Sequence, residues 1–274
     1  MLLVAQLDAL QGHALLAVAA LAAGAVNSFA GGGTILTFPV LGAILPDLPG
    51  RLVTANATST IGLWPGAATA AWAYRGERGD VPTWARWLVV PSVLGAIAGT
   101  ALLIVLPPAW FDALVPWLIL SAALLFAGQP QLAALGSGPP GSASGPPSGG
   151  APARIEAACG LQFLVSVYGG YFGAGIGILM LAVLGMLGLG DIHRLNGVKN
   201  VLGMVVNGVA AGMFALGSLA GWHAVSWPHA AVMAVASILG SLGASHLARR
   251  LPARIVRRCV ALIGFALAAY YFLR

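Results

Sequence analysis

The sequence predicts an all-α polytopic integral membrane protein made of two inverted repeats, and three observations lead to this fold class. The chain of 274 residues is 59% hydrophobic and only 7% charged, whereas an ordinary soluble domain has about 25% charged residues. Its apolar residues stand in continuous segments separated by charges and by clusters of Pro and Gly. The two halves also share one pattern at a fixed spacing. So few charges cannot cover a soluble protein of this size, which excludes the soluble classes.

The apolar segments are expected to be helices, because a lipid environment leaves an open backbone no other way to satisfy its polar groups. Most of them approach the roughly 20 residues that a helix needs to cross a bilayer. Two are shorter, 33–46 and 174–189, and each follows a glycine-rich break. The predicted segments cover residues 9–30, 33–46, 52–74, 85–106, 110–128, 155–172, 174–189, 196–218, 227–248 and 255–273.

A stretch without charge divides the chain. It contains GSGPPGSASGPPSGG, a composition typical of flexible linkers. The predicted organisation is therefore a first transmembrane repeat over 1–128, a Gly/Pro/Ser linker over 129–153 and a second transmembrane repeat over 154–274.

The repeat is visible when the sequence is shifted by 143 residues. This shift aligns 29–52 with 172–195 without a gap, and nine of the 24 aligned pairs are identical, among them Phe29 with Phe172 and Gly32 with Gly175. Internal repeats of this kind are a frequent mark of secondary transporters.

Charge decides between two orientations of the repeats. If each glycine-broken pair crosses the membrane once, the repeats are parallel and the basic residues divide almost evenly between the two sides. If each pair enters and returns as a hairpin, the second repeat is inverted, and 11 of the 13 basic residues fall on the side of the linker. Because the positive-inside rule favours the second arrangement, we expect inverted repeats, an inner linker and outer termini.

The two glycine breaks are candidate binding positions. Glycine permits tight turns, and a helix that begins after such a turn directs N–H groups and a positive dipole end toward it, which suits an anion. The alternative is that the small residues only allow close helix packing. The predicted substrate-binding residues here are Asn27, Ser28, Gly31, Gly32, Gly33 and Thr34 in the first break, and Tyr168, Tyr171, Gly173 and Gly175 in the second.

Polar residues also open the helix that follows each broken pair. Asn56 and Thr60 share one helical face, and Lys199 with Asn200 occupies the same stretch of the second copy. We predict that all four bind substrate. An ammonium inside a span is costly unless it is paired or near water, and the alternative for Lys199 is that it reaches the cytoplasmic edge of the membrane.

Arg51 and Arg194 are equivalent in the repeat and stand at the starts of two helices, where a cation is disfavoured by about 0.3–1 kcal/mol. The same unfavourable choice in both copies suggests an anion at each mouth. We therefore predict that Arg51 and Arg194 form gates for the substrate.

Four motifs carry a resemblance to a known family. The NSFAGGG turn, the TANATST stretch, GGYFGAGIGILML and NGVKN together resemble the sulfite exporter (TauE/SafE) family of membrane permeases, over both halves of the chain. The resemblance implies a plasma (inner) membrane protein that transports small anions, commonly sulfite or organosulfonates, with export the usual direction.

The expected function is therefore a secondary transporter that works by alternating access around a central site at the two breaks. A membrane-embedded enzyme and a passive anion channel remain as alternatives. Ser245 and His246 would be enzyme candidates, but they lack a carboxylate at catalytic spacing, so no enzymatic activity, cofactor or metal is expected. The expected partners are a small inorganic or organosulfur anion and the lipid bilayer, without nucleic acid, and a homo-oligomer is left open.

Overall fold

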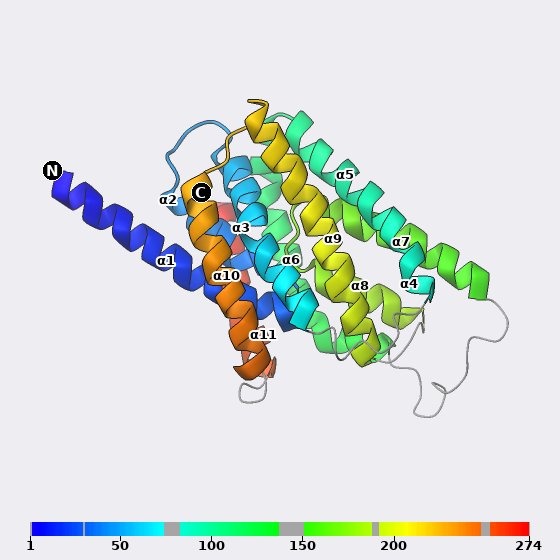
Figure 1. Cartoon of the computed structure of the whole chain (residues 1–274). Helices are drawn as coiled ribbons and strands as arrows, with labels where there is room; N and C mark the ends of the chain where they lie inside the picture. Colours follow the sequence, from blue (N-terminus) through cyan, green and yellow to red (C-terminus); the bar gives the residue numbers. More distant parts are fainter. Residues whose placement is uncertain are drawn as a thin grey trace.

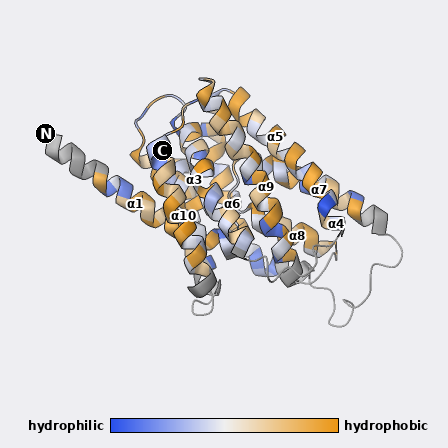
Figure 2. Cartoon of the chain, in the orientation of Figure 1, coloured by the Kyte–Doolittle hydropathy of each residue, from blue (hydrophilic) through white to orange (hydrophobic). Residues whose placement is uncertain are grey.

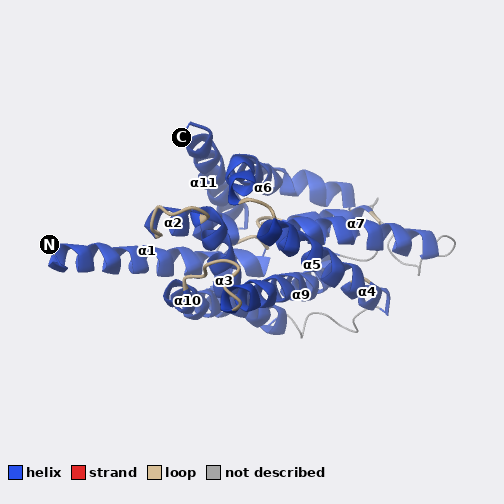
Figure 3. Cartoon of the chain, turned by 90° about the horizontal axis from the view of Figure 1, so that it is seen from above, coloured by secondary structure: helices blue, strands red, loops and turns tan. Residues whose placement is uncertain are grey.

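The computed structural model describes residues 2–29, 31–73, 83–136, 151–187, 192–247 and 253–273, and within these ranges every regular element is a helix (Figures 1 and 3). In chain order the helices are α1 (Leu2–Phe29), α2 (Thr34–Ile44), α3 (Arg51–Ala73), α4 (Thr83–Trp87), α5 (Val89–Val105), α6 (Pro108–Gly136), α7 (Ala151–Tyr171), α8 (Ile176–Met186), α9 (Ile192–Leu219), α10 (Trp227–Leu247) and α11 (Ala253–Leu273).

Five helical stretches among the described residues are long and apolar enough to cross a membrane: Leu10–Ser28, Trp84–Val105, Pro108–Gln131, Leu195–Leu219 and Trp227–Ala244. Many large apolar side chains on the helices are exposed, and apolar residues colour most of the ribbon (Figure 2). Such a surface suits contact with lipid rather than water. The chain is a multi-pass membrane protein, as the sequence predicts.

The two shorter apolar helices, α2 and α8, contain 11 residues each. At 1.5 Å per residue such a helix is about 16 Å long, roughly half of the ~30 Å hydrocarbon core. Both helices begin directly after the glycine breaks, so each break lies about half a membrane deep if its helix ends near the surface.

The first broken pair folds as a hairpin. A Cβ built at Gly33, at the start of α2, would overlap Ala23 of α1. A Cβ built at Gly12 would lie 3.8 Å from Cβ of Ile44, at the other end of α2. Helix α2 therefore runs back along α1 and does not continue its direction.

Helices of the two halves pack in corresponding pairs. The most extensive contacts join α1 with α10 and α5 with α7, and further contacts join α3 with α9 and α6 with α11. Helices α1, α2, α3, α5 and α6 correspond in order to α7, α8, α9, α10 and α11. If each helix is exchanged for its counterpart, the contact of α1 with α10 becomes the contact of α7 with α5. The contacts of α3 with α9 and of α6 with α11 each map onto themselves.

Small residues explain how closely these pairs approach. A Cβ at Gly99 of α5 would overlap the carbonyl oxygen of Val167 in α7, and one at Gly240 of α10 would overlap that of Leu21 in α1. The backbones are in direct contact at both crossings, which is the usual packing of small residues between membrane helices.

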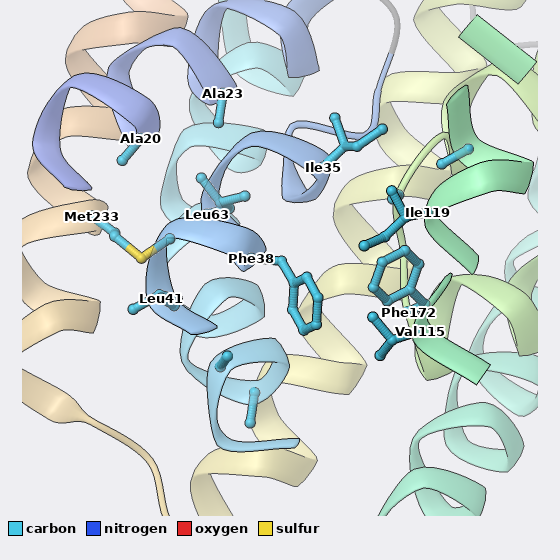
Figure 4. Packing of buried hydrophobic residues seen from close by; sticks show 14 of the residues in the cluster. Ala20, Ala23, Ile35, Phe38, Leu41, Leu63, Val115, Ile119, Phe172 and Met233 are labelled. Atoms are coloured by element: carbon cyan, nitrogen blue, oxygen red, sulfur yellow. The ribbon is translucent and has the colours of Figure 1, made fainter. Parts of the chain in front are cut away.

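The core between the halves is aromatic. Phe38 of α2 lies edge-on to Phe172, with ring centroids 5.4 Å apart, and packs in the same way on Phe111 of α6 at 6.1 Å. All three side chains are buried. Figure 4 shows Phe38 beside Phe172, Val115 and Ile119. This cluster fixes α2 and the second break against α6.

Two boundaries differ from the expected linker range of 129–153. Helix α6 continues to Gly136, because Pro130 is accommodated within it, and α7 begins at Ala151. The remaining positions, 137–150, lie outside the described residues.

Candidate substrate site

The two glycine breaks meet in the middle of the molecule. A Cβ at Gly32 would overlap the backbone nitrogen of Gly175, and one at Gly31 would lie 2.8 Å from Cα of Gly177. The two backbones therefore touch, with no room for a side chain between them. Segments separated by 143 residues of sequence form one structural unit here.

Positive backbone φ angles add a second requirement for glycine. Gly31 and Gly32 have φ of 68° and 116°, and Gly173 and Gly175 have φ of 81° and 77°. L residues rarely adopt this region, whereas glycine enters it without steric cost. The glycines of the breaks are thus required both by backbone conformation and by the contact between the two turns.

Asn27 closes the first break. Its Oδ1 accepts hydrogen bonds from the backbone N–H groups of Gly32 (2.8 Å) and Gly33 (2.7 Å). These groups belong to the amino-terminal end of α2, where N–H donors have no partner within the helix. The sequence predicts that such donors face an anion, whereas in the structure the side chain of Asn27 accepts from two of them.

The second break is held differently. The repeat pairs Asn27 with Gly170, which has no side chain to accept a hydrogen bond. Instead the hydroxyl of Tyr168 donates to the carbonyl oxygen of Ala174 at 2.7 Å. The two turns have similar backbones but different polar support.

A small cavity of about 30 Å³ opens beside the touching breaks. Its volume corresponds to about one water molecule. Its wall consists of parts of both breaks, the carboxyl-terminal half of α3 and the amino-terminal half of α9: Asn27, Gly31, Gly32, Thr34, Leu63, Ala67, Ala70, Gly173, Ile176, Gly177, Lys199, Asn200, Gly203, Met204 and Asn207.

Lys199 lies in the wall of this cavity and is only 1% exposed. The alternative that its side chain reaches the membrane edge is therefore wrong. Among the described residues of the wall, Lys199 is the one with a formal charge, because the others are amides, a threonine, glycines and apolar side chains.

Two amide side chains of α9 accompany Lys199. Asn200 is 7% exposed and its Nδ2 is buried with no hydrogen-bond acceptor. One to two turns further on, Asn207 Nδ2 donates to the carbonyl oxygen of Gly203 at 2.8 Å. A buried donor without an acceptor is rare and costs free energy, so Asn200 presents a group ready for a polar ligand.

Seven of the predicted binding residues lie in the cavity wall: Asn27, Gly31, Gly32, Thr34, Gly173, Lys199 and Asn200. The others are not part of it. Asn56 donates from Nδ2 to the carbonyl oxygen of Tyr171 (3.1 Å), and the hydroxyl of Thr60 donates to the carbonyl oxygen of Asn56 (2.9 Å).

The remaining predicted residues support the breaks or the adjoining helices. The hydroxyl of Ser28 donates to the carbonyl oxygen of Gly24 at 3.2 Å, Gly33 donates to Asn27, and Gly175 contacts Gly32 from outside the wall. Tyr168 bonds the second break, and Tyr171 packs on Phe111.

Several wall residues were missed by the sequence reasoning. Leu63, Ala67, Ala70, Ile176 and Met204 are apolar and carry no chemical signal in the sequence. Gly203 and Asn207 are different, because they lie four and eight residues beyond Lys199 and so continue its helical face. That spacing could have identified both.

Arg51 lies outside the cavity. Its guanidinium forms an ion pair with Asp47, with 2.9 Å between Nη1 and Oδ1. A surface hollow of about 530 Å³ contains Arg51 together with Asp47 and Asp112. A carboxylate of the chain thus supplies the anion expected beside Arg51. The side chain of Arg194, at the start of α9, lies outside the described residues.

A multi-pass helical protein with a buried polar cavity at two broken helices belongs to the class of membrane transporters. Comparison with known proteins agrees. The sulfite exporter TauE/SafE family model matches residues 16–271, which is nearly the whole chain, and the chain belongs to this family.

A relative is named "Probable membrane transporter protein ORF9", from Sinorhizobium sp. It is 28% identical to this chain over 263 residues, which are 93% of this chain and 90% of the relative. No solved structure matches the chain.

Proposed function

We propose that this protein is a secondary transporter that exports a small sulfur-containing anion, such as sulfite or an organosulfonate, through a central site beside the two touching breaks. The observation that carries the proposal is the buried cavity in which Lys199 and Asn200 lie against both breaks. Family membership supports a transported anion. The described residues of the wall supply the chemistry, namely an ammonium and amide donors, without a carboxylate among them.

The proposed mechanism is alternating access. The cavity lies between the carboxyl-terminal half of α3 and the amino-terminal half of α9. The opposite half of the α3–α9 pair is closed: Asn56 bonds the second break, Thr37 bonds Ser59 at 2.7 Å, and Phe214 of α9 is fully buried. A site that is hollow toward one side and packed toward the other corresponds to one end state of such a cycle.

We further propose that the two repeats are inverted in the membrane. The hairpin of α1 and α2 supports this, because a returning first pair gives each repeat an odd number of crossings. The exchanged packing of corresponding helices fits a pseudo-two-fold relation. With inversion, the basic residues gather on the linker side, and the cavity faces that side, the cytoplasm.

The membrane potential is a sufficient driving force in this proposal. It supplies about 2.3 kcal/mol per charge for each 100 mV, so an anion leaves an inside-negative cell without a coupled ion. The described residues of the cavity wall include no Asp or Glu that could relay a proton.

The test is anion flux from liposomes that contain the purified protein. Radiolabelled sulfite, and separately a labelled alkyl sulfonate, is trapped inside, and its efflux is followed with an imposed potential. We expect saturable efflux, and we expect unlabelled substrate on the outside of the liposomes to accelerate it, as for a carrier. Linear, non-saturable flux would indicate a channel, and the absence of any flux would contradict the proposal.

A further inference from the structure

We infer that the closed half of the α3–α9 pair holds a second binding position for the anion, which the substrate meets when the protein opens to the opposite side of the membrane. The position is formed by a cluster of five polar residues, the closed-half cluster: Thr37, Asn56, Thr58, Ser59 and Tyr171. The inference rests on the proposed function, since it requires alternating access. It adds to that function the residues and the chemistry of the second end state.

The closed-half cluster lies on the same helix as the cavity but nearer the other end of that helix. Leu63 of α3 lines the cavity, whereas Asn56, Thr58 and Ser59 precede it by one turn or more and are at most 1% exposed. The hydroxyl oxygen of Thr58 accepts at 3.0 Å from the backbone N–H of Ser226, which follows the carboxyl-terminal end of α9. Because the cavity adjoins the amino-terminal half of α9, the cluster lies toward the other side of the membrane.

Two polar atoms of the cluster have no hydrogen-bond partner among the described residues. They are Oδ1 of Asn56 and the hydroxyl oxygen of Tyr171, and both are buried. A region that served only as a seal would be more stable with apolar side chains, because an unpaired buried polar group costs free energy. Unpaired groups of this kind call for an explanation, and contact with a ligand in another end state supplies one.

The repeat places this cluster where a cavity would form if the two halves exchanged conformations. The spacing of 143 residues pairs Lys199 in the cavity wall with Asn56, and it pairs the wall residue Leu63 with Val206. Asn56 and Val206 are both at most 1% exposed, so these counterparts of wall residues are packed on the closed side. An exchange of conformations would open the closed-half cluster and close the present cavity.

The cluster offers neutral hydrogen-bond donors, which suit the oxygens of a sulfonate or a similar oxyanion. The hydroxyls of Thr37 and Ser59 bond each other at 2.7 Å, and Nδ2 of Asn56 donates to the carbonyl oxygen of Tyr171 at 3.1 Å. Both bonds join α3 to the half-helix α2 or to the second break. If α2 and the second break separate from α3, these donors become free, and an anion that accepts from them stabilises the open arrangement.

The test is the accessibility of a thiol in the cluster from each side of the membrane. Ser59→Cys exchanges one small side chain for another and is made after replacement of Cys159 and Cys259 by serine. The thiol is treated in intact cells and in inverted membrane vesicles with sulfonatoethyl methanethiosulfonate, an impermeant reagent that itself carries a sulfonate. Gly203→Cys, in the cavity wall, is treated in the same way. We expect both thiols to react, but from opposite sides of the membrane, because the two end states alternate.

A ligand and a control variant assign the reaction to an anion site. Methanesulfonate at about ten times its dissociation constant should slow the reaction of Ser59→Cys at least about fivefold, because the bound anion occupies the site. The matched control is Thr100→Cys. Thr100 is also fully buried, and its hydroxyl donates to Gly170 next to Tyr171, but it lies on α5 outside the cluster. Its thiol should react from neither side, whereas a general loosening of the fold would expose both thiols.

The outcomes separate this inference from the proposed function. The inference would be overturned if Ser59→Cys transported sulfite but did not react, reacted from the same side as Gly203→Cys, reacted without protection by methanesulfonate, or reacted no faster than Thr100→Cys. If Ser59→Cys does not fold, Thr37→Cys, across the same hydrogen bond, undergoes the same comparison. Each of these results leaves the anion site in the cavity in place. If the parent protein moved neither labelled anion, the proposed function itself would be contradicted.

Discussion

At the scale of single residues, the glycines of the two breaks are the least replaceable positions. Gly32 combines a φ of 116° with a contact in which any Cβ would overlap the nitrogen of Gly175. The neighbouring wall residue Gly203 has neither constraint, because a Cβ there meets no atom within 4 Å. Two glycines of one cavity thus differ sharply in what they allow.

Gly32→Ala should therefore reduce anion flux by at least about tenfold and lower the thermal stability. The left-handed region alone costs an L residue about 1–2 kcal/mol, and the steric overlap adds to this. Gly203→Ala, the matched control, should leave both the anion flux and the thermal stability close to those of the parent protein. Flux in proteoliposomes and thermal unfolding measure both, and equal behaviour of the two variants would contradict the account.

Asn27 provides the second prediction at this scale. Asn27→Ala removes the acceptor of two backbone N–H groups and should destabilise the protein by about 1–2 kcal/mol. Asn207→Ala serves as the control, because the amide of Asn207 donates only to the carbonyl oxygen of Gly203 within its own helix, α9. The measurement is the free energy of unfolding of the two variants. An equal or larger loss for Asn207→Ala would show that the two hydrogen bonds accepted by Asn27 do not stabilise the protein.

The sequence predicted the breaks, Lys199 and Asn200 because their residue types are unusual within apolar spans. Asn56 and Thr60 share a helical face outside the cavity wall, where Asn56 donates to Tyr171 of the second break and Thr60 donates to the backbone of α3. Periodicity identifies residues on one face without saying what that face meets. The acceptor role of Asn27 toward its own break was not predictable either, since it depends on the path of the turn.

At the scale of elements, the central feature is the returning half-helix. Each glycine-broken pair allows two interpretations from its sequence, one crossing or a hairpin, and the distribution of basic residues favours the hairpin. In the structure α2 runs back along α1, with Gly12 beside Ile44. The length of α2 could be predicted closely, whereas the end of α6 could not, because Pro130 falls within the expected linker but is accommodated in the helix.

The hairpin predicts a specific cross-link. A Cβ at Gly12 lies 3.8 Å from Cβ of Ile44, which matches the mean separation in disulfides of about 3.8 Å. After replacement of Cys159 and Cys259 by serine, Gly12→Cys/Ile44→Cys should form a disulfide under mild oxidation, seen by mass spectrometry. The pair Gly12→Cys/Ile35→Cys, at opposite ends of the hairpin, should not. Failure of the first pair with intact folding would exclude the returning helix.

At the scale of the whole molecule, the two copies share a pattern but occupy different environments. The spacing of 143 pairs Asn56 with Lys199, yet Lys199 lies in the cavity and Asn56 bonds the second break. A repeat in the sequence cannot reveal which copy lies on the open side, because that depends on the conformational state. The sequence therefore predicted a central site but not its asymmetry.

The proposed inversion predicts the sidedness of the loops. Leu48 is exposed in the turn before α3, on the same side as the termini in the inverted arrangement. In a background without Cys159 and Cys259, Leu48→Cys should react with a membrane-impermeant maleimide in intact cells. Ser144→Cys, in the expected linker, should react only after permeabilisation. Labelling of both from the same side would rule out the inverted topology.

The most direct test of the central claim, that substrate passes through the cavity beside the touching breaks, is flux after alkylation of Gly203→Cys. The new thiol enters open space in the wall, so the unmodified variant should transport like the parent without native cysteines. After reaction with N-ethylmaleimide and removal of the reagent, sulfite flux should fall by at least about tenfold. Gly212→Cys, on the exposed face of the same helix and also with free space for a side chain, should keep its flux when alkylated to the same extent. Full flux through alkylated Gly203→Cys would place the substrate path elsewhere.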